Sequence, residues 1–390
     1  MKLQEINWHG SPAKPFVEKG GSKAGDYLFL KQFKQFQKHL PTGTYYLEPG
    51  QDIEKFLNKF WFWSSEFNRP KIVRACHPLD FVGMVDVIPS IPNVTGKEGI
   101  RKAFYELIEY AQRSAVASYM QYETQEIFRG DIGIFIQDYY GLPRFSILEH
   151  PHQKGVYRIG QVQESKYSFS GSGEFVQEVI SNDISKTLYN TSEHSRNNID
   201  IALIKKAIEL YKSIYDIGLI PKEYSCQMEF GINEVTSELM FYQSRLFKPF
   251  SERANFNLED LRPTNRLYKT PYYGSFGVTP PQGEEMVLAG LSNFDNEKIK
   301  TEPKVVYDYG FQGLHHSSEL YVQPRNMAAY IPTETSSLLE HGHYRWLQRS
   351  PVSINFPASI DSVLDTTNEN EFPKIKVYSN GFVGAFEILK

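Results

Sequence analysis

Apolar residues between positions 201 and 217 recur at the spacing of an α-helix. They occupy positions 201, 204, 207, 208, 211 and 215, which share one face of a helix with a period of 3.6 residues. This pattern predicts an amphipathic helix from Ile201 to Ile217. The same criteria predict a helix from Asp26 to His39, closed by Pro41, and a longer one from Lys97 to Gln125.

Shorter runs of β-branched and aromatic residues predict strands. Such runs cover Ile72–Ala75 and Ile132–Gln137, and a pair of strands is expected between Phe145 and Val162. The stretch Ser165–Asn198 is rich in serine, asparagine and glycine, so we expect a mobile pair of loops there. After a polar segment from Phe250 to Tyr272 the pattern returns to short strands, and the fold class expected is α/β (α+β).

Two strand-forming runs, Cys226–Ile232 and Leu239–Arg245, flank a short polar connector and predict a β-hairpin. A loop centred near position 235 or 236 sets Glu229 roughly opposite Gln243, and the two-residue period of a strand places Arg245 on the same face. Carboxylate and amide oxygens are ligands suited to Mg²⁺, and an adjacent arginine can neutralise a phosphate. The same pattern is typical of an ordinary amphipathic hairpin with one solvated face, and both interpretations stay open here.

A glycine-rich turn, Gly20-Gly-Ser-Lys-Ala-Gly25, precedes the first predicted helix. Backbone N–H groups at the start of a helix point outward and attract anions, so the turn is a candidate phosphate cradle.

Length and composition limit the remaining choices. A chain of 390 residues predicts two domains, or three, and the polar segment near position 265 is the expected boundary. The net charge of -4 gives no general attraction to nucleic acid or to an anionic membrane, so we expect neither as a partner. Cys76 and Cys226 are too few for a disulfide framework or a cysteine-only zinc site, which fits the cytoplasm. We see neither an export signal nor an apolar run of membrane-spanning length.

Several of these segments together resemble the phosphoenolpyruvate synthase and pyruvate phosphate dikinase family, which includes rifampin phosphotransferase. Gly20–Gly25 is similar to the family's phosphate-binding turn, and the stretch from Val73 to Val85 is similar to its Arg-Ser-Ser and Phe-Ala-Gly segments. The resemblance implies that residues 1–265 form an ATP-grasp domain. Within it Lys23 and Arg74 contact phosphates, and Gln137 lies beside the adenine.

The predicted hairpin carries the next part of the resemblance. Met228-Glu-Phe-Gly231 and Gln243-Ser-Arg245 look like the family's Ile-Glu-Trp-Ala and Gln-x-Arg-Pro elements. By this resemblance Glu229 and Gln243 are Mg²⁺ ligands, and Arg245 is a nucleotide-binding and catalytic residue.

The C-terminal part resembles the family's swivelling β/β/α phosphohistidine domain, which implies such a domain over residues 270–390. Thr333-Glu-Thr-Ser-Ser-Leu-Leu-Glu-His341 is similar to the loop whose histidine carries phosphate, so His341 is the implied catalytic phosphoryl carrier. The loop departs from the family pattern at Ser336 and Ser337, which replace glycines, and at Glu340, whose carboxylate would repel a phosphorylated imidazole. In the N-terminal part, Val87 replaces the threonine that follows the family's Phe-Ala-Gly segment. No phosphoenolpyruvate-binding barrel follows, so we expect a two-domain abridgement.

The resemblance thus implies an ATP-dependent phosphotransferase of the dikinase type that uses ATP and Mg²⁺. The phosphoryl group would pass through His341 to an unidentified small molecule or to a separately encoded partner protein. Two alternatives stay open: an ATP-grasp enzyme that phosphorylates its substrate directly, and a degenerate nucleotide-binding regulatory protein. A zinc site at His315 and His316, or at His341 and His343, is a further alternative reading of the histidines.

Overall fold

The computed structural model of the chain describes most of its residues, and the fold presented below concerns these residues alone. They are residues 3–60, 69–82, 88–114, 116–118, 130–141, 145–162, 176–181, 189–190, 201–233, 236–261, 267–269, 275–290, 293, 296–308, 326–334, 350–354, 356–357, 361–364 and 372–389.

The chain divides into two compact units. Residues 1–145 and 206–247 form the first unit, and residues 146–205 and 248–390 form the second. Each unit therefore draws on two stretches of the chain, whereas the sequence predicted a single boundary between residues 265 and 270. The ATP-grasp and swivelling domains stay predictions.

The first unit contains a four-stranded antiparallel sheet in the order β1-β4-β2-β3. Its strands are β1 (Tyr45–Leu47), β2 (Lys71–Cys76), β3 (Ser90–Val94) and β4 (Gly133–Asp138). The two central strands, β2 and β4, are buried along their whole length. They confirm the strands predicted at these places to within one residue at each end.

The register between β2 and β4 decides which side chains share a face. Arg74 pairs with Phe135, and Ile72 pairs with Gln137. Because alternate residues of a strand point to the same face, Arg74 and Gln137 lie on one face of the sheet, while Lys71, paired with Asp138, lies on the other. One strand thus supplies a buried cation to each face.

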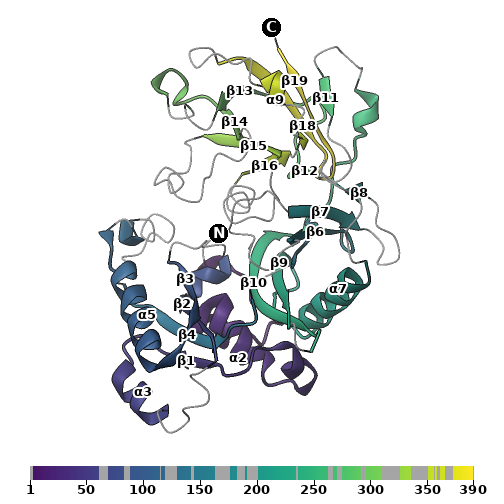
Figure 1. The fold of residues 1–390 in the computed structure, drawn as a ribbon. Coiled ribbons are helices and arrows are strands. Elements are labelled where there is room, and N and C mark those ends of the chain that lie inside the picture. The colour runs from purple at the N-terminus through teal and green to yellow at the C-terminus, as the bar shows by residue number, and fades with distance from the viewer. Residues whose placement is uncertain are drawn as a thin grey trace. The chain divides into compact units, whose positions relative to one another are not determined.

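Helical segments accompany both faces of this sheet (Figure 1). α1 (Lys14–Gly20), the π-helical turn η2 (Gly21–Gly25) and α2 (Asp26–Leu30) follow one another without a break. Ala24 and Tyr27 of this segment pack on Phe135, and so cover the face that carries Arg74. α5 (Gly96–Ala111) lies beside β2 and β3, and α3 (Ile53–Phe60) lies beside α5.

Two predicted helices are interrupted. The helix predicted from Asp26 to His39 ends at Leu30, and a 3-10 helix, η3 (Lys34–His39), follows it. Phe33 is extended between them, which lets three aromatic rings, those of Phe29, Phe33 and Phe36, pack edge to face and buries Phe36. α5 ends at Ala111, where the N–H groups of the next two residues also reach carbonyls three positions back and tighten the last turn. Helical residues resume at positions 114 and 116–118, and the predicted end at Gln125 lies outside the described residues.

The helix predicted over residues 201–217 is confirmed as α7 (Ile201–Asp216). It precedes the strands β9 (Tyr224–Ile232) and β10 (Leu239–Pro249), which are neighbours in a sheet and cover the two runs of the predicted hairpin. The Tyr211 hydroxyl donates to the backbone carbonyl of Cys226 at 3.0 Å and thereby ties α7 to β9.

The second unit is dominated by a nine-stranded mixed sheet in the order β11-β19-β18-β13-β14-β15-β16-β12, with β17 paired to β15. Its strands are β11 (Leu267–Lys269), β12 (Ser275–Phe276), β13 (Glu284–Gly290), β14 (Lys304–Asp308), β15 (Met327–Glu334), β16 (Val352–Ile354), β17 (Phe356–Pro357), β18 (Lys374–Ser379) and β19 (Gly384–Ile388). β13 to β16 run parallel, while β18, β19 and β11 add antiparallel strands at one side. Three short helical elements of this unit lie within the described residues: η6 (Leu258–Asp260), η7 (Glu297–Ile299) and α9 (Asp361–Leu364).

The same unit contains β5 (Phe145–Glu149) except for its first residue, and β6 (Tyr157–Val162), β7 (Val176–Ser181) and β8 (Tyr189–Asn190). These four strands are neighbours in this order. β5 and β6 confirm the predicted strand pair. The loop pair predicted over Ser165–Asn198 is wrong in part, because β7 pairs antiparallel with β6 over six residues. Three β-branched residues within Val176–Ser181 favour a strand more than the surrounding serines and glycines favour a loop. Among all the described residues no helix is both long and apolar enough to cross a membrane.

Candidate functional site

The glycine-rich turn of the first unit is packed against its neighbours. All five residues of η2 are buried. Gly21 has φ +61°, and a Cβ atom there would lie 2.0 Å from the backbone oxygen of His77. A Cβ at Gly25 would lie 2.5 Å from the backbone oxygen of Phe16. The two glycines are therefore required for close packing of the backbone, a role that the sequence pattern did not suggest.

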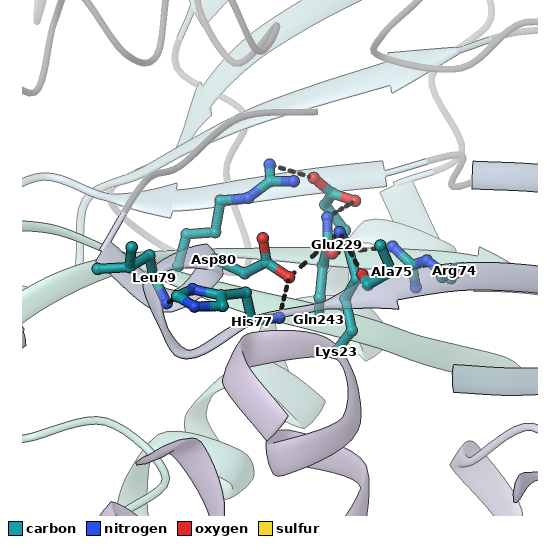
Figure 2. Close-up of polar contacts among 9 residues, drawn as sticks. Lys23, Arg74, Ala75, His77, Leu79, Asp80, Glu229 and Gln243 are labelled. Carbon is teal, nitrogen blue, oxygen red and sulfur yellow. Dashed lines mark hydrogen bonds and ion pairs between the residues drawn. The ribbon is translucent and has the colours of Figure 1, made fainter. Parts of the chain in front are cut away.

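Lys23 points from this turn into a buried polar cluster (Figure 2). Its Nζ donates to the backbone oxygen of Ala75 at 3.2 Å and pairs with the Asp80 carboxylate at 3.3 Å. Asp80 belongs to η5 (Pro78–Val82) and also accepts a hydrogen bond from the backbone N–H of His77 at 3.3 Å. The lysine is 4% exposed, so Asp80 is the counter-ion that allows its charge to be buried.

Arg74 and Gln243 meet in the same cluster, although 169 residues separate them in sequence. The Arg74 Nη2 donates to the Gln243 Oε1 at 2.8 Å, and the Gln243 Nε2 donates to the Glu229 Oε2 at 2.7 Å (Figure 2). The second oxygen of Glu229 accepts from the Arg245 Nη1 at 2.8 Å. A continuous chain of hydrogen bonds thus joins two guanidinium groups through one amide and one carboxylate.

The four side chains of this chain are almost inaccessible to solvent. Their exposed fractions are 6% for Arg74, 3% for Glu229, 1% for Gln243 and 2% for Arg245. The structure therefore brings together five of the site residues that the sequence singled out, namely Lys23, Arg74, Glu229, Gln243 and Arg245. The roles assigned to them stay predictions.

Two donors on the Arg74 face of the sheet lack an acceptor in the part of the chain that the structure describes. They are the Nε of Arg74 and the Nε2 of Gln137, which is the sixth predicted site residue. Both side chains are more than nine-tenths buried. A buried donor without an acceptor costs about 1–3 kcal/mol, so these two N–H groups are suited to a ligand that brings acceptor oxygens or nitrogens.

Asp26 is a buried carboxylate that the sequence analysis missed. Its Oδ2 accepts from both the backbone N–H and the hydroxyl of Ser244, each at 2.7 Å, and so fixes β10 between Gln243 and Arg245. Burial raises the pKa of Asp26 well above its usual value, and the two hydrogen bonds from Ser244 only partly oppose this. An acidic residue after a glycine-rich turn is normally interpreted as solvated. Its partner Ser244 lies 218 residues away on the buried strand β10, so no local signal in the sequence indicates that Asp26 is buried.

Cys76 lies on the same face of β2 as Arg74, and its thiol is not suited to act as a nucleophile. Burial raises the pKa of its thiol to about 12, so the sulfur stays protonated and is a poor nucleophile.

Glu229 and Gln243 are the residues expected to hold Mg²⁺. A carboxylate and an amide oxygen are Mg²⁺ ligands in kind. As they lie here, Glu229 and Gln243 do not fit Mg²⁺. The Gln243 oxygen accepts a hydrogen bond from Arg74, and both Glu229 oxygens accept from N–H donors. The residues that the structure describes include no group of three or more His, Cys, Asp or Glu suited to a metal. The metal roles of Glu229 and Gln243 stay predictions.

The second unit holds a polar cluster of a different kind. The His150 Nε2 donates to the backbone oxygen of Ser275 at 3.1 Å, while its Nδ1 accepts from the backbone N–H of His152 at 3.2 Å. In His152 the Nε2 accepts from the backbone N–H of Gly277 at 2.9 Å, which leaves its Nδ1 to donate to the Ser251 hydroxyl at 2.9 Å. Burial, followed by the nearby His152, lowers the pKa of His150 to about 3. Both imidazoles are neutral, and each ring nitrogen forms a hydrogen bond. We therefore interpret the two histidines as structural residues.

Several predicted features lie outside the described residues. These are His341 and the departures Ser336, Ser337 and Glu340, the residue Val87, and the histidines of the zinc alternative, His315, His316 and His343. The phosphohistidine and zinc interpretations therefore stay predictions.

Comparison with known proteins gives distant structural likenesses. No protein-family model matches this sequence, and no curated protein matches it. Among solved structures, PH1788 from Pyrococcus horikoshii Ot3 is similar over 62% of this chain and 98% of its own, with 12% identity and a TM-score of 0.39. Ca. Korarchaeum cryptofilum ACD1 in complex with coenzyme A covers 60% of this chain and 95% of its own, with 16% identity and a TM-score of 0.35.

The D-alanine-D-alanine ligase from Coxiella burnetii is similar over 60% of this chain, with 10% identity and a TM-score of 0.32. This chain spans about half of the ligase, 48% of its length. TM-scores and identities of this size carry no argument about fold or activity. The mixed α/β class follows from the strands and helices themselves.

Proposed function

We propose that the first unit binds the phosphates of ATP at the cluster of Lys23, Arg74 and Arg245, and that the chain transfers a phosphoryl group from ATP to an acceptor. The observation that supports the proposal most is the burial and incomplete hydrogen bonding of Arg74. Arg74 is 6% exposed. Its guanidinium donates to a neutral amide rather than a carboxylate, and its Nε has no acceptor in the described chain. A buried cation in this condition favours an anionic ligand, and phosphate oxygens match its fork of donors.

Neighbouring groups support a ligand with several negative charges. Lys23 and Arg245 add two cations to the same cluster, against the carboxylates of Asp80 and Glu229. With Arg74, three cations of the described chain lie in one cluster, where the oxygens of a triphosphate would accept from them. Gln137, on the same face as Arg74, has an unpartnered Nε2 that would donate to a ring nitrogen of the base.

The resemblance of Gly20–Gly25, Arg74 and the hairpin to the dikinase family supports ATP as that ligand and phosphoryl transfer as the reaction. In such a transfer the bond from phosphorus to the bridging oxygen of ATP breaks, and a bond to the acceptor oxygen or nitrogen forms. Cations placed on the non-bridging oxygens stabilise the charge that spreads over them. In the proposal an ATP-grasp domain performs this step, Arg245 contacts the transferred group, and the acceptor is a small molecule or a protein.

Labelled ATP tests the proposal and separates its two routes. The chain is incubated with ATP labelled at the β- or γ-phosphate, and ATP consumption and label on the protein are measured after acid and base treatment. A label that is lost in acid and retained in base, and that disappears in His341→Ala, identifies the histidine relay. ATP consumption without label on the protein identifies direct transfer. A chain that neither binds nor consumes ATP overturns the proposal.

A further inference from the structure

Three segments of the first unit carry the cations of the cluster, and side-chain hydrogen bonds link them in pairs. The segments are the turn η2 with the start of α2, the strand β2 and the strand β10. Lys23 on the turn donates to the backbone oxygen of Ala75 on β2 at 3.2 Å. Arg74 on β2 donates to Gln243 on β10 at 2.8 Å.

The third link joins α2 to β10. The Asp26 Oδ2 accepts from the backbone N–H and from the hydroxyl of Ser244, each at 2.7 Å, and both residues are fully buried. β10 is the last strand in the order of its sheet, so the N–H groups along one of its edges have no strand to bond to in the described chain. Asp26 supplies an acceptor at this edge.

This third link differs from the other two in its chemistry. Lys23 and Arg74 form their links with cationic donors, so a phosphate that binds them competes for the same N–H groups. Asp26 is the acceptor of its link, and the oxygens of a phosphate are acceptors as well. A bound phosphate therefore weakens the first two links and leaves the bonds between Asp26 and Ser244 intact.

The link also lies next to the cations in sequence. Asp26 follows Lys23 by three residues, which is less than one turn of a helix, and Ser244 stands between Gln243 and Arg245. A restraint between Asp26 and Ser244 therefore restrains the backbone that carries Lys23 relative to the backbone that carries Arg245.

We propose that Asp26 is a positioning residue of the phosphate site: its bonds to Ser244 keep the turn of Lys23 and the strand of Arg245 together while a ligand occupies the cations. The inference rests on the proposed function for the identity of the ligand. Asp26 acts through these two cations and does not itself bind the phosphates. Its Oδ1 has no donor among the described residues, so an amide can replace the carboxyl group and keep an oxygen for Ser244.

Affinity for ATP in three variants, measured by calorimetry on the whole chain, tests the inference. Asp26→Leu removes the acceptor, so ATP should bind about tenfold more weakly, the scale of one charged hydrogen bond to a phosphate. Ser244→Ala loses the hydroxyl and keeps the N–H, so its affinity should fall about threefold. Asp26→Asn keeps an acceptor and should remain within about twofold of wild type.

Ser11→Ala is the matched control for Ser244→Ala. The Ser11 hydroxyl donates to the backbone oxygen of Gly218 at 2.8 Å, which is another buried bond of the first unit between residues far apart in sequence. Urea denaturation should show similar losses of stability in the two alanine variants, whereas ATP affinity should fall in Ser244→Ala alone. Equal losses of affinity would show that the link contributes general stability only, and would overturn the inference.

Hydrogen exchange of the backbone, measured by mass spectrometry without nucleotide, gives a readout that does not depend on ATP. Asp26→Leu should exchange faster than wild type both in residues 21–25 and around Ser244, and Asp26→Asn should match wild type. Unchanged exchange in Asp26→Leu, or an unchanged affinity for ATP, overturns the inference. If Asp26→Leu does not fold, the comparison of Ser244→Ala with Ser11→Ala decides. Should wild type fail to bind ATP, the proposed function fails, and faster exchange in both segments still shows that Asp26 holds them together.

Discussion

Lys71 and Arg74 lie three residues apart on β2 and face opposite sides of the same sheet. Lys71 is fully buried and forms an ion pair with Asp138, its direct partner on β4. The other Asp138 oxygen accepts from the Thr42 hydroxyl at 2.7 Å. Arg74 is buried almost as deeply, yet it meets a neutral amide and keeps one N–H without an acceptor in the described chain.

The difference between the two cations indicates different roles. Lys71 has a carboxylate of its own, so its charge is neutralised within the fold. Arg74 reaches the Glu229 carboxylate only through the Gln243 amide, and Glu229 also forms an ion pair with Arg245. A buried charge that the fold neutralises contributes to structure, while one that it leaves partly unmatched is prepared for a ligand. Four predictions test this distinction.

Lys71→Met should cause the largest loss of stability. It leaves the Asp138 carboxylate buried without its cation, which is expected to lower the free energy of unfolding by about 3–5 kcal/mol. Urea denaturation measures the loss. The double variant Lys71→Met with Asp138→Leu should recover most of it, because both charges are gone. A single variant as stable as wild type would show that the pair contributes little.

Arg74→Met should change stability little and ATP affinity strongly. The free energy of unfolding should change by less than about 1 kcal/mol, since an incompletely satisfied guanidinium is removed. Affinity for ATP, measured by calorimetry, should fall about 10- to 100-fold, the scale of one or two charged hydrogen bonds. If instead the variant unfolds as easily as Lys71→Met and keeps its ATP affinity, the two cations have the same structural role.

Asp26→Asn extends the comparison to a buried carboxylate whose donors among the described residues are neutral. Because burial raises the pKa of Asp26, the folded chain keeps a proton that the unfolded chain loses above its ordinary value of 3.8. The contribution of this residue to stability is therefore fully present below that value and declines as the pH rises towards the folded-state pKa. Asparagine retains an acceptor for Ser244 and cannot ionise, so the variant should be about 1 kcal/mol more stable than wild type at pH 7 and about equal near pH 4. Urea titrations at the two pH values measure this; a variant that is less stable at both would show that Ser244 needs the charged acceptor.

Asp80→Asn should have the smallest effect. A phosphate that approaches Lys23 competes with the Asp80 carboxylate at 3.3 Å, and the amide keeps an acceptor but loses the charge. ATP affinity should rise about threefold, the scale of a single modest ion pair. Asp131→Asn, at an exposed position of the same unit, is the charge-matched control and should leave the affinity unchanged. Weaker binding in Asp80→Asn would mean that Asp80 holds Lys23 in place for the ligand.

Periodicity was sufficient for elements whose local pattern agrees with their packing. α7 follows the spacing of its apolar residues, and β2, β4 and the hairpin strands follow runs of strand-forming residues. The pattern failed where packing opposed it. The helix after Asp26 breaks at Phe33 to place three aromatic rings, and β7 forms within a stretch whose composition is typical of loops.

The site was predictable only in its residue types. Resemblance to a family named Lys23, Arg74, Glu229, Gln243 and Arg245, and the fold brings them together. The orientation of Gln243 was not predictable, because it depends on an arginine 169 residues away, and the Lys71–Asp138 pair joins residues 67 apart. Polar residues on a strand are typically read as a solvated face, so a sequence alone conceals which of them are buried together.

The two cysteines provide a chemical reporter of the unit that carries the site. Cys76 and Cys226 are the only thiols of the chain, both are reduced and buried, and both belong to the first unit. A thiol reagent can reach them only when β2 or β9 separates from its neighbours, so the rate of alkylation measures how often this unit opens. A nucleotide that binds at the cluster should slow that rate in proportion to its occupancy, and the wild-type chain needs no added label for the measurement.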